Sequence, residues 1–240
     1  MYKKIYFKTL PSTNQFLKEH YKDYQDKTVV ICNYQSKGRG RFGRIWEMEE
    51  NGNIAMSILL KPKIRLDRIS QISLLTSAAI FNVISKYAAN VTIKWPNDIL
   101  VNGKKICGVL LESIISTKLE ALIVGIGLNL NYEKIPSHLE AKATSLYLET
   151  QQKYNKEDII NNIINEFEKL YQNFLIGQND FLNICKQNSI VIGKYVKING
   201  NYVYVEDIKD NGNIVVTNGL EEKEYAYGEV SIDYNFSKEK

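Results

Sequence analysis

The chain of 240 residues is poor in the side chains that form cross-links or bind metals. It has three cysteines and two histidines, and Cys32, Cys107 and Cys185 lie far apart with no Cys-x-x-Cys pair. A disulfide framework or a zinc site needs several such residues at short spacings, so the sequence predicts neither. Unpaired cysteines fit a reducing compartment, and we therefore expect a cytoplasmic protein.

The chain also lacks long apolar runs and a strong charge of one sign. No segment reaches the roughly 18 consecutive apolar residues of a membrane span. The N-terminal sequence MYKKIYFKTLPSTN has no apolar core of a signal peptide. The net charge of +4 is too small for a polycation that coats nucleic acid or membrane. With 44% hydrophobic residues, the chain is expected to be folded, with any cationic function confined to one place.

Hydrophobic periodicity alternates strands with helices over most of the chain. Expected helices cover residues 14–24, 66–89 and 156–187, the last interrupted near Gly177. Expected strands cover residues 4–8, 28–34 and 53–60, followed by successive strands between 90 and 132. From 190 to 232 the chain has only short strand-like runs separated by Asn-Gly turns, which predicts a small appended β-barrel. We therefore expect two domains, 1–187 and 188–240.

The most informative segment is residues 35–46, QSKGRGRFGRIW, in which three glycines alternate with four cations. Glycine lets the backbone approach a ligand closely, and arginine offers paired donors to phosphate or carboxylate oxygens. The pattern predicts a loop that wraps a small anion, mobile when empty and ordered when occupied. A solvated basic loop and an arginine-glycine RNA-binding segment remain open on this segment alone.

A second informative segment is KWPND at residues 94–98, which precedes an Asn102-Gly103 turn. Asn-Gly favours a two-residue type I′ hairpin, which would place Asp98 opposite Cys107. Asp98 and Lys105 would then share one face of the hairpin as diagonal neighbours. A carboxylate that can hold magnesium beside an ammonium group suits phosphate chemistry. The alternative is a cross-strand ion pair with no catalytic role.

Two further segments carry weaker signals. Ser12 reads as the N-cap of a helix, with Gln15 completing a capping box, yet polar groups at such a start can also bind a urea-like ring. Gly125 and Gly127 interrupt an apolar strand and predict close approach by a ligand or another part of the backbone. Alone, a strand glycine can also mark a bulge.

In this order, the segments resemble the biotin-protein ligases. The resemblance rests on Ser12-Thr13-Asn14, Gln35, GRGRFGRIW at 38–46, KWPND at 94–98, Lys105 with Gly108, and GIGLN at 125–129. The ending YGEVS at 227–231 resembles the C-terminal barrel of that family. The resemblance spans nearly the whole chain, and the ordered co-occurrence is far more specific than any one motif.

The resemblance implies an enzyme that activates biotin with ATP and Mg²⁺ and transfers it to a lysine of a biotin carboxyl carrier protein. It implies an α+β fold in which a mixed β-sheet is flanked by helices, as in class II synthetases, with a small C-terminal SH3-like β-barrel. The ligase pattern begins at residue 12. We therefore expect a ligase-only form without an N-terminal DNA-binding domain, with no specific DNA binding and no membrane partner. A homodimer is left open.

The resemblance also implies roles for individual residues. Lys105 would contact the biotin carboxylate and the α-phosphate, Arg41 would close over them, and Asp98 would bind metal or orient the incoming lysine. The other implied contacts to biotin or nucleotide are Ser12, Thr13, Asn14, Gln35, Gly38, Arg39, Gly40, Trp46, Asn97, Gly108 and Asn129, the last to the nucleotide.

Two other functions are weighed against this one. A lipoate-protein ligase would share the catalytic fold and the acyl-adenylate chemistry, but its glycine and arginine motifs normally differ. A non-enzymatic RNA-binding module would use the arginine-glycine loop as its ligand surface. Aromatic residues are not concentrated beside that loop as stacking platforms would require, and the other motifs would stay unexplained.

Overall fold

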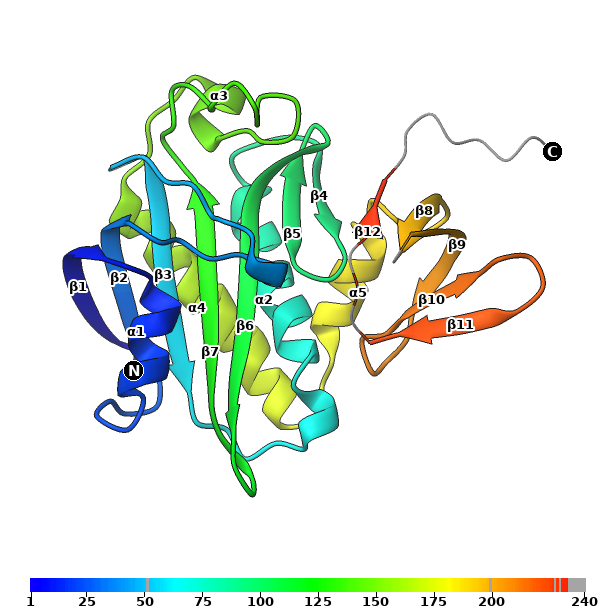
Figure 1. Ribbon diagram of the computed structural model, residues 1–240, viewed down its shortest axis with the longest axis horizontal. Coiled ribbons are helices and arrows are strands. Elements are labelled where there is room, and N and C mark those ends of the chain that lie inside the picture. The colour runs from blue at the N-terminus through cyan, green and yellow to red at the C-terminus, as the bar shows by residue number, and fades with distance from the viewer. Residues whose placement is uncertain (51, 199, 227, 229, 233–240) are drawn as a thin grey trace.

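The larger part of the fold is a mixed, seven-stranded sheet (Figure 1). The computed structural model describes residues 1–50, 52–198, 200–226, 228 and 230–232. The strand order is β1-β2-β3-β7-β6-β5-β4, with β1 and β2 parallel and the other neighbours antiparallel. The strands are β1 (Lys3–Leu10), β2 (Thr28–Gln35), β3 (Asn53–Leu60), β4 (Val91–Lys94), β5 (Asp98–Val101), β6 (Lys104–Ile115) and β7 (Leu119–Asn129). The predicted mixed sheet is therefore confirmed.

Helices cover both faces of this sheet, because its central strands are apolar on both sides. On β2, Val29 and Ile31 pack into the large core beneath the helices α2 (Gln71–Ile84) and α4 (Lys156–Leu175). The alternate residues Val30 and Cys32 face the other side, where α1 (Thr13–His20) contributes the fully buried Leu17. The remaining helices are α3 (Leu146–Thr150) and α5 (Asp180–Gln187), with short 3₁₀ turns at Arg41–Gly43 and Leu66–Arg68.

The expected helix over 66–89 is too long. It divides into the 3₁₀ turn at Leu66–Arg68 and α2, which ends at Ile84. Tyr87 and Ala88 still pack against the core from the turn that follows, so the apolar pattern continues past the helix. The first helix likewise ends at His20, four residues before its expected end. The predicted interruption near Gly177 is confirmed, with that glycine at φ +88° between α4 and α5.

The β5–β6 hairpin has the predicted turn but a different register. Asn102 and Gly103 both have positive φ, at +50° and +78°. A register shift then pairs Ile99 with Cys107 and Asp98 with Gly108, so the expected pairing of Asp98 with Cys107 is wrong. The cause is a β-bulge, in which one strand carries an extra residue opposite its partner.

The C-terminal part forms a five-stranded antiparallel sheet of order β11-β10-β9-β8-β12. Its strands are β8 (Tyr195–Ile198), β9 (Asn201–Ile208), β10 (Ile214–Thr217), β11 (Glu222–Tyr225) and β12 (Val230–Ser231). It fits the expected SH3-like unit, although Tyr227 and Glu229 of the YGEVS segment lie outside the described residues. The boundary at 187/188 stays a prediction, since Ser189 still forms a bridge with Ile93 of β4.

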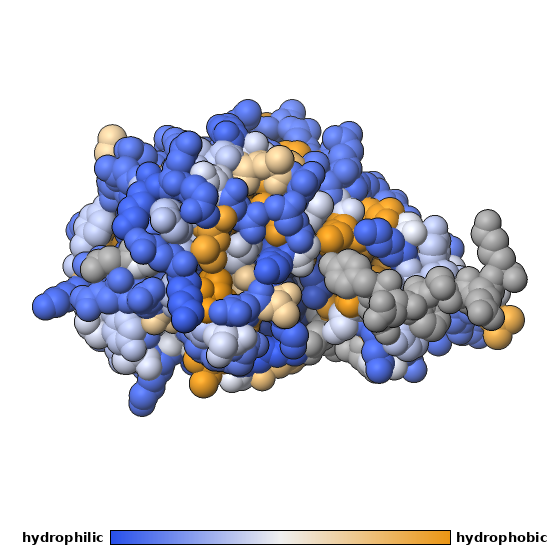
Figure 2. All heavy atoms as spheres, turned by 90° about the horizontal axis from the view of Figure 1, so that it is seen from above, coloured by the Kyte–Doolittle hydropathy of each residue, from blue (hydrophilic) through white to orange (hydrophobic). Residues whose placement is uncertain are grey.

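The two sheets share one apolar core. The buried Trp95 donates from its indole nitrogen to the carbonyl oxygen of Gly212 at 3.1 Å, and Gln71 donates to the carbonyl oxygen of Asp210 at 2.8 Å. The surface seen from above is largely hydrophilic, with apolar residues visible over the centre of the larger unit and near its junction with the C-terminal sheet (Figure 2). Among the described residues, no helix is long and apolar enough to span a membrane.

Candidate active site

A cavity of about 170 Å³ lies against the sheet, between the N-terminus of α1, the glycine-arginine loop (residues 36–46) and the β4–β5 turn. Its floor includes Gly108 of β6 and Gly125 and Gly127 of β7. The structure brings together every predicted site residue except Gly38 and Asn129. Segments that are far apart in the sequence, from Ser12 to Gly127, thus converge on one cavity.

The glycine-arginine loop folds back on itself as a short hairpin over the cavity. Trp46 N donates to Gly38 O at 3.0 Å, and Gly40 N donates to Arg44 O at 2.8 Å. A Cβ atom on Gly38 would lie 2.3 Å from Trp46 O, so only glycine fits there. Gly38 therefore shapes the loop instead of lining the cavity.

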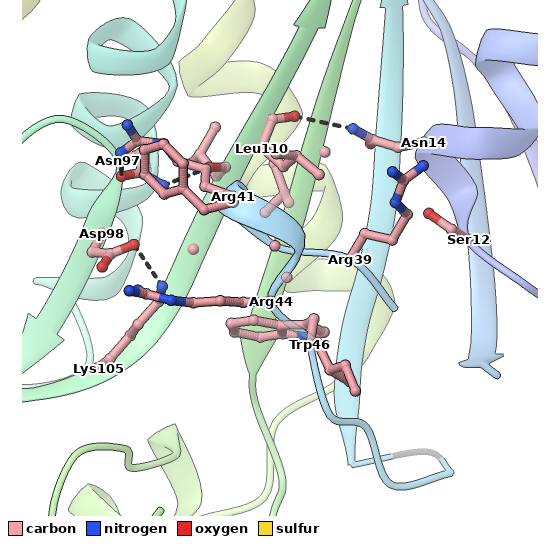
Figure 3. A pocket seen from close by; sticks show the side chains of 18 of the residues that line it. Ser12, Asn14, Arg39, Arg41, Arg44, Trp46, Asn97, Asp98, Lys105 and Leu110 are labelled. Atoms are coloured by element: carbon pink, nitrogen blue, oxygen red, sulfur yellow. Dashed lines mark hydrogen bonds and ion pairs between the residues drawn. The ribbon is translucent and has the colours of Figure 1, made fainter. Parts of the chain in front are cut away.

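Arg41 joins the loop to two other parts of the chain (Figure 3). Its guanidinium donates to Asn97 Oδ1 at 2.8 Å and to Gly228 O at 2.9 Å. The Asn97 amide is held in turn by its own donation to Val109 O at 2.8 Å. Arg41 thus links the loop, the β4–β5 turn and the C-terminal part.

Asp98 and Lys105 meet at one side of the cavity. Lys105 Nζ lies 2.6 Å from Asp98 Oδ1 and 5.7 Å from the centre of the Trp46 ring. The shared face predicted from the hairpin is confirmed: Lys105 stands opposite Leu100, two residues from Asp98, and the two side chains form an ion pair across this diagonal. Arg44 lies close to the pair in Figure 3.

The cavity is strongly cationic. Among the described residues that line it, the one acidic side chain is Asp98, against the cations Arg39, Arg41, Arg44, Lys94 and Lys105. Within the described part of the chain, no three His, Cys, Asp or Glu side chains cluster as a metal site. One carboxylate fits a magnesium ion that is held mainly by substrate phosphates, the usual arrangement for this ion. The charge distribution therefore suits an anionic ligand with several negative groups.

At the opposite end of the cavity, the uncharged polar side chains of Ser12, Thr13, Asn14 and Gln35 lie together, with Arg39 beside them (Figure 3). Thr13 N donates to Gln35 Oε1 at 2.7 Å, and Ser12 caps α1 by accepting from Gln15 N at 3.4 Å. The reciprocal half of the predicted capping box is wrong, because the Gln15 side chain donates to Glu19 Oε1 instead, at 2.8 Å.

Two glycines of β7 allow a close approach to the sheet, but by side chains and not by the backbone that was considered from the sequence. A Cβ atom on Gly125 would lie 2.2 Å from Asn14 Oδ1, and one on Gly127 would lie 2.5 Å from Trp46 Cε2. Both distances are far inside van der Waals contact. The glycines therefore seat Asn14 and Trp46 directly on the strand.

Asn129 lies outside the cavity. Its Oδ1 accepts from Asn53 Nδ2 at 2.8 Å, and its Nδ2 donates to Thr144 O at 2.9 Å. These bonds use the amide to tie β7 to β3 and to the segment before α3. A nucleotide contact by Asn129 stays a prediction.

Sequence reasoning missed Ser57 and Glu112, which stand behind the cavity wall. Ser57 is the only hydroxyl residue in β3, a strand whose every residue is buried. A polar residue in such a strand signals a buried hydrogen bond, and this signal could have been used. Glu112 carried no comparable signal, because its partners come from a helix about a hundred residues earlier.

Comparison with known proteins agrees with this geometry. The sequence pattern of the Biotin/lipoate A/B protein ligase family matches residues 6–129. The chain belongs to this family. It is 36% identical over 176 residues to the bifunctional ligase/repressor BirA of Bacillus subtilis, covering 71% of this chain and 54% of that protein. It is 41% identical over 105 residues to a biotin-(acetyl-CoA-carboxylase) ligase of Paracoccus denitrificans, covering 42% and 43% of the two chains. The chain thus spans about half the length of these curated relatives.

Solved structures of this family share the whole fold. The biotin protein ligase from Aquifex aeolicus in complex with biotin and ATP superimposes with a TM-score of 0.86 at 28% identity. The match covers 96% of this chain and 98% of that one. The biotin ligase catalytic fold with its C-terminal unit, expected from the resemblance, is therefore confirmed.

Proposed function

We propose that this member of the family is a biotin-protein ligase, which converts biotin and ATP to biotinyl-5′-AMP and then transfers biotin to a lysine of a carrier protein. The observation that carries the proposal is a single cavity that joins a group of uncharged polar side chains at the start of α1 to the cations around Lys105. Biotin has a matching polarity, with a cyclic urea at one end and a carboxylate at the other. Lipoate has no urea, and the polar end would be left without partners.

In the first step, an oxygen of the biotin carboxylate attacks the α-phosphorus of ATP. The new bond is the mixed anhydride, and the bond from the α-phosphorus to pyrophosphate breaks. Both reactants are anions, so the barrier contains a large repulsion that fixed cations lower. Lys105, on the far side of the cavity from Ser12 and Asn14, is placed to supply that charge.

Magnesium carried on the phosphates would neutralise further charge, and Asp98 is the carboxylate that could hold it. In the second step, a neutral lysine amine of the carrier attacks the acyl carbon. The amide bond forms, the bond from the acyl carbon to the phosphate oxygen breaks and releases AMP, and the proton lost by the amine passes to water. Asp98 could orient the amine before attack, since it reaches the cavity edge beside Lys105.

The mixed anhydride reacts readily with water, so it must be covered until the carrier arrives. The glycine-arginine loop lies over the cavity and is tied down through Arg41. The protein acceptor is proposed by analogy with the Paracoccus denitrificans relative, whose name specifies acetyl-CoA carboxylase.

Transfer to a carrier domain tests the proposal. The protein is incubated with ATP, magnesium, a biotin carboxyl carrier domain and either biotin or lipoate, and the carrier is analysed by intact mass spectrometry. We expect a biotin adduct only with biotin, and none on a carrier whose acceptor lysine is replaced by arginine. A lipoyl adduct without a biotinyl adduct would overturn the assignment of substrate.

A further inference from the structure

A buried chain of hydrogen bonds runs from the polar end of the cavity to the far side of the sheet. Ser57 Oγ lies 2.7 Å from Thr13 Oγ1 and 2.6 Å from Asn14 Oδ1. Asn14 Nδ2 lies 3.0 Å from Glu112 Oε2. Thr13 and Asn14 line the cavity, whereas Ser57 and Glu112 do not.

The far end of the chain fixes which way the Asn14 amide points. Asn14 Nδ2 donates to Leu110 O at 3.1 Å and to Glu112 Oε2. Burial would raise the pKa of Glu112, but hydrogen bonds from Asn14 and Lys18, with the charges of Lys18 and Arg39, lower it overall. Glu112 is therefore a carboxylate at neutral pH and can only accept. A flipped amide would place its oxygen against two acceptors.

The direction of the remaining bonds follows from the number of hydrogens. A serine hydroxyl carries one hydrogen, and Asn14 Oδ1 can only accept, so Ser57 donates to Asn14. Thr13 must then donate its own hydroxyl hydrogen to Ser57 Oγ. Thr13 Oγ1 also lies 3.1 Å from Gln35 Oε1, but this contact is longer than the 2.7 Å contact to Ser57 Oγ, a contact that would otherwise hold no hydrogen, and Gln35 Oε1 also accepts from Thr13 N. The cavity is thus offered an acceptor, Thr13 Oγ1, beside Gln35, whose Nε2 carries two hydrogens and directs one toward Met48 Sδ at 3.6 Å.

We infer that Glu112 and Ser57 are positioning residues that fix, through Asn14 and Thr13, the donor and acceptor pattern presented to a cyclic urea. A cyclic urea needs that pattern, because its carbonyl oxygen accepts and its N–H groups donate. Without Ser57, the Thr13 hydroxyl can rotate and turn its hydrogen toward a urea N–H. The inference rests on the proposed function and adds two residues that do not touch the ligand.

Binding of biotin without ATP isolates this effect from the chemistry. We expect Ser57→Ala and Glu112→Ala each to raise the Kd for biotin about tenfold in isothermal titration, while the Kd for ATP stays unchanged. Glu112→Gln keeps an acceptor oxygen for Asn14 and should restore most of the affinity. Ser57→Ala should also reduce the preference for biotin over a biotin methylated on one urea nitrogen.

The chain provides matched controls. Glu120, on the neighbouring strand β7, accepts from the hydroxyl of Tyr21 at the other end of α1. Ser77 in α2 is fully buried, and its hydroxyl has no hydrogen-bond partner among the described residues. Glu120→Ala and Ser77→Ala should leave both Kd values unchanged.

The inference is overturned if Ser57→Ala and Glu112→Ala bind biotin like the wild type, or if they weaken biotin and ATP equally. If Ser57→Ala does not fold, as judged by thermal melting, the Kd values for biotin of Glu112→Ala and Glu112→Gln test the inference. A wild-type protein that does not bind biotin would refute the proposed function itself.

Discussion

Among single residues, Lys105 occupies the position on which the chemistry depends most. Its ammonium group lies between Asp98 and the face of Trp46, and its side chain is 35% exposed. It is held in place, yet one side remains open to a ligand. Such a fixed cation stabilises charge that builds up in a transition state without having to reorganise.

Replacing Lys105 with alanine should slow biotinyl-adenylate formation about 10²-fold, because one fixed charge contact in the transition state is lost. Single-turnover quench experiments with radiolabelled ATP measure this step directly. Lys104→Ala is the matched control, since Lys104 is the adjacent residue of β6 and is exposed. A near-normal single-turnover rate in Lys105→Ala would exclude this role.

A contact between two side chains could be predicted from the sequence only where the two residues are close together along the chain. The approach of Lys105 to Asp98 follows from an Asn-Gly turn a few residues away. The partnership of Glu112 with Asn14 and Lys18 requires α1 to pack over β3 and β7 so that its side chains reach β6, which no local pattern encodes. Asn14 was predicted to touch biotin, but its amide also orients its neighbours.

Among structural elements, the glycine-arginine loop is attached at its tip through the side chain of Arg41. Arg41 reaches both Asn97 and the backbone of Gly228. Phe42 and Gly43 beside it adopt positive φ, at +56° and +73°, so the tip is a sharp reversal. The loop is thereby drawn down over the cavity.

Arg41→Gly should release the loop and let biotinyl-adenylate escape before transfer. Chromatography of reactions without carrier protein should detect several-fold more free adenylate than the wild type releases. Arg65→Gly serves as control, because Arg65 is exposed and bonds only locally to Asp67. Equal release by Arg41→Gly and the wild type would show that Arg41 does not retain the intermediate.

Turns could be predicted from the sequence more securely than helix ends or strand register. Asn102, Gly103 and Gly177 have positive φ, and glycine and Asn-Gly pairs are the residue types that favour this conformation. The end of α2 could not be predicted, because Tyr87 and Ala88 in the following turn continue the apolar pattern of the helix. The bulge in the β5–β6 pair could not be predicted either, because its extra residue is Ile106 and not a glycine or proline that would indicate an irregularity.

On the scale of the whole molecule, the two sheets are joined through a segment that also lines the cavity. Trp95 of the KWPND segment is only 2% exposed, and its indole nitrogen bonds to Gly212 in the C-terminal part. Its neighbours Asn97 and Asp98 reach the cavity. The sequence predicted two units and their order, but not that one short segment would connect the cavity to both.

The stability of the whole fold should depend on pH through Glu168, which ties α4 to the N-terminal strand. Glu168 accepts from the hydroxyl of Tyr2 at 2.8 Å and pairs with Lys27. Partial burial would raise the pKa of Glu168, but the bonds from Lys27 and Tyr2 lower it below the ordinary 4.5. A lowered pKa stabilises the folded state above the ordinary value, and this contribution is lost as pH falls through the folded value.

We therefore expect Glu168→Gln to melt below the wild type at pH 7, with the difference in Tm shrinking from roughly pH 5 downward. Differential scanning calorimetry over this range measures it. Glu140→Gln, at an exposed glutamate, should follow the wild type throughout. A difference that stayed constant down to pH 3 would show that ionisation of Glu168 is not the cause.

The most direct test of the central claim is ATP–pyrophosphate exchange in the presence of magnesium, with biotin, with lipoate or with no added acid. The exchange reports reversible formation of the acyl-adenylate and needs no carrier protein. We predict exchange only with biotin. Exchange with lipoate alone, or no exchange under any condition, would contradict the assignment of this cavity to biotin activation.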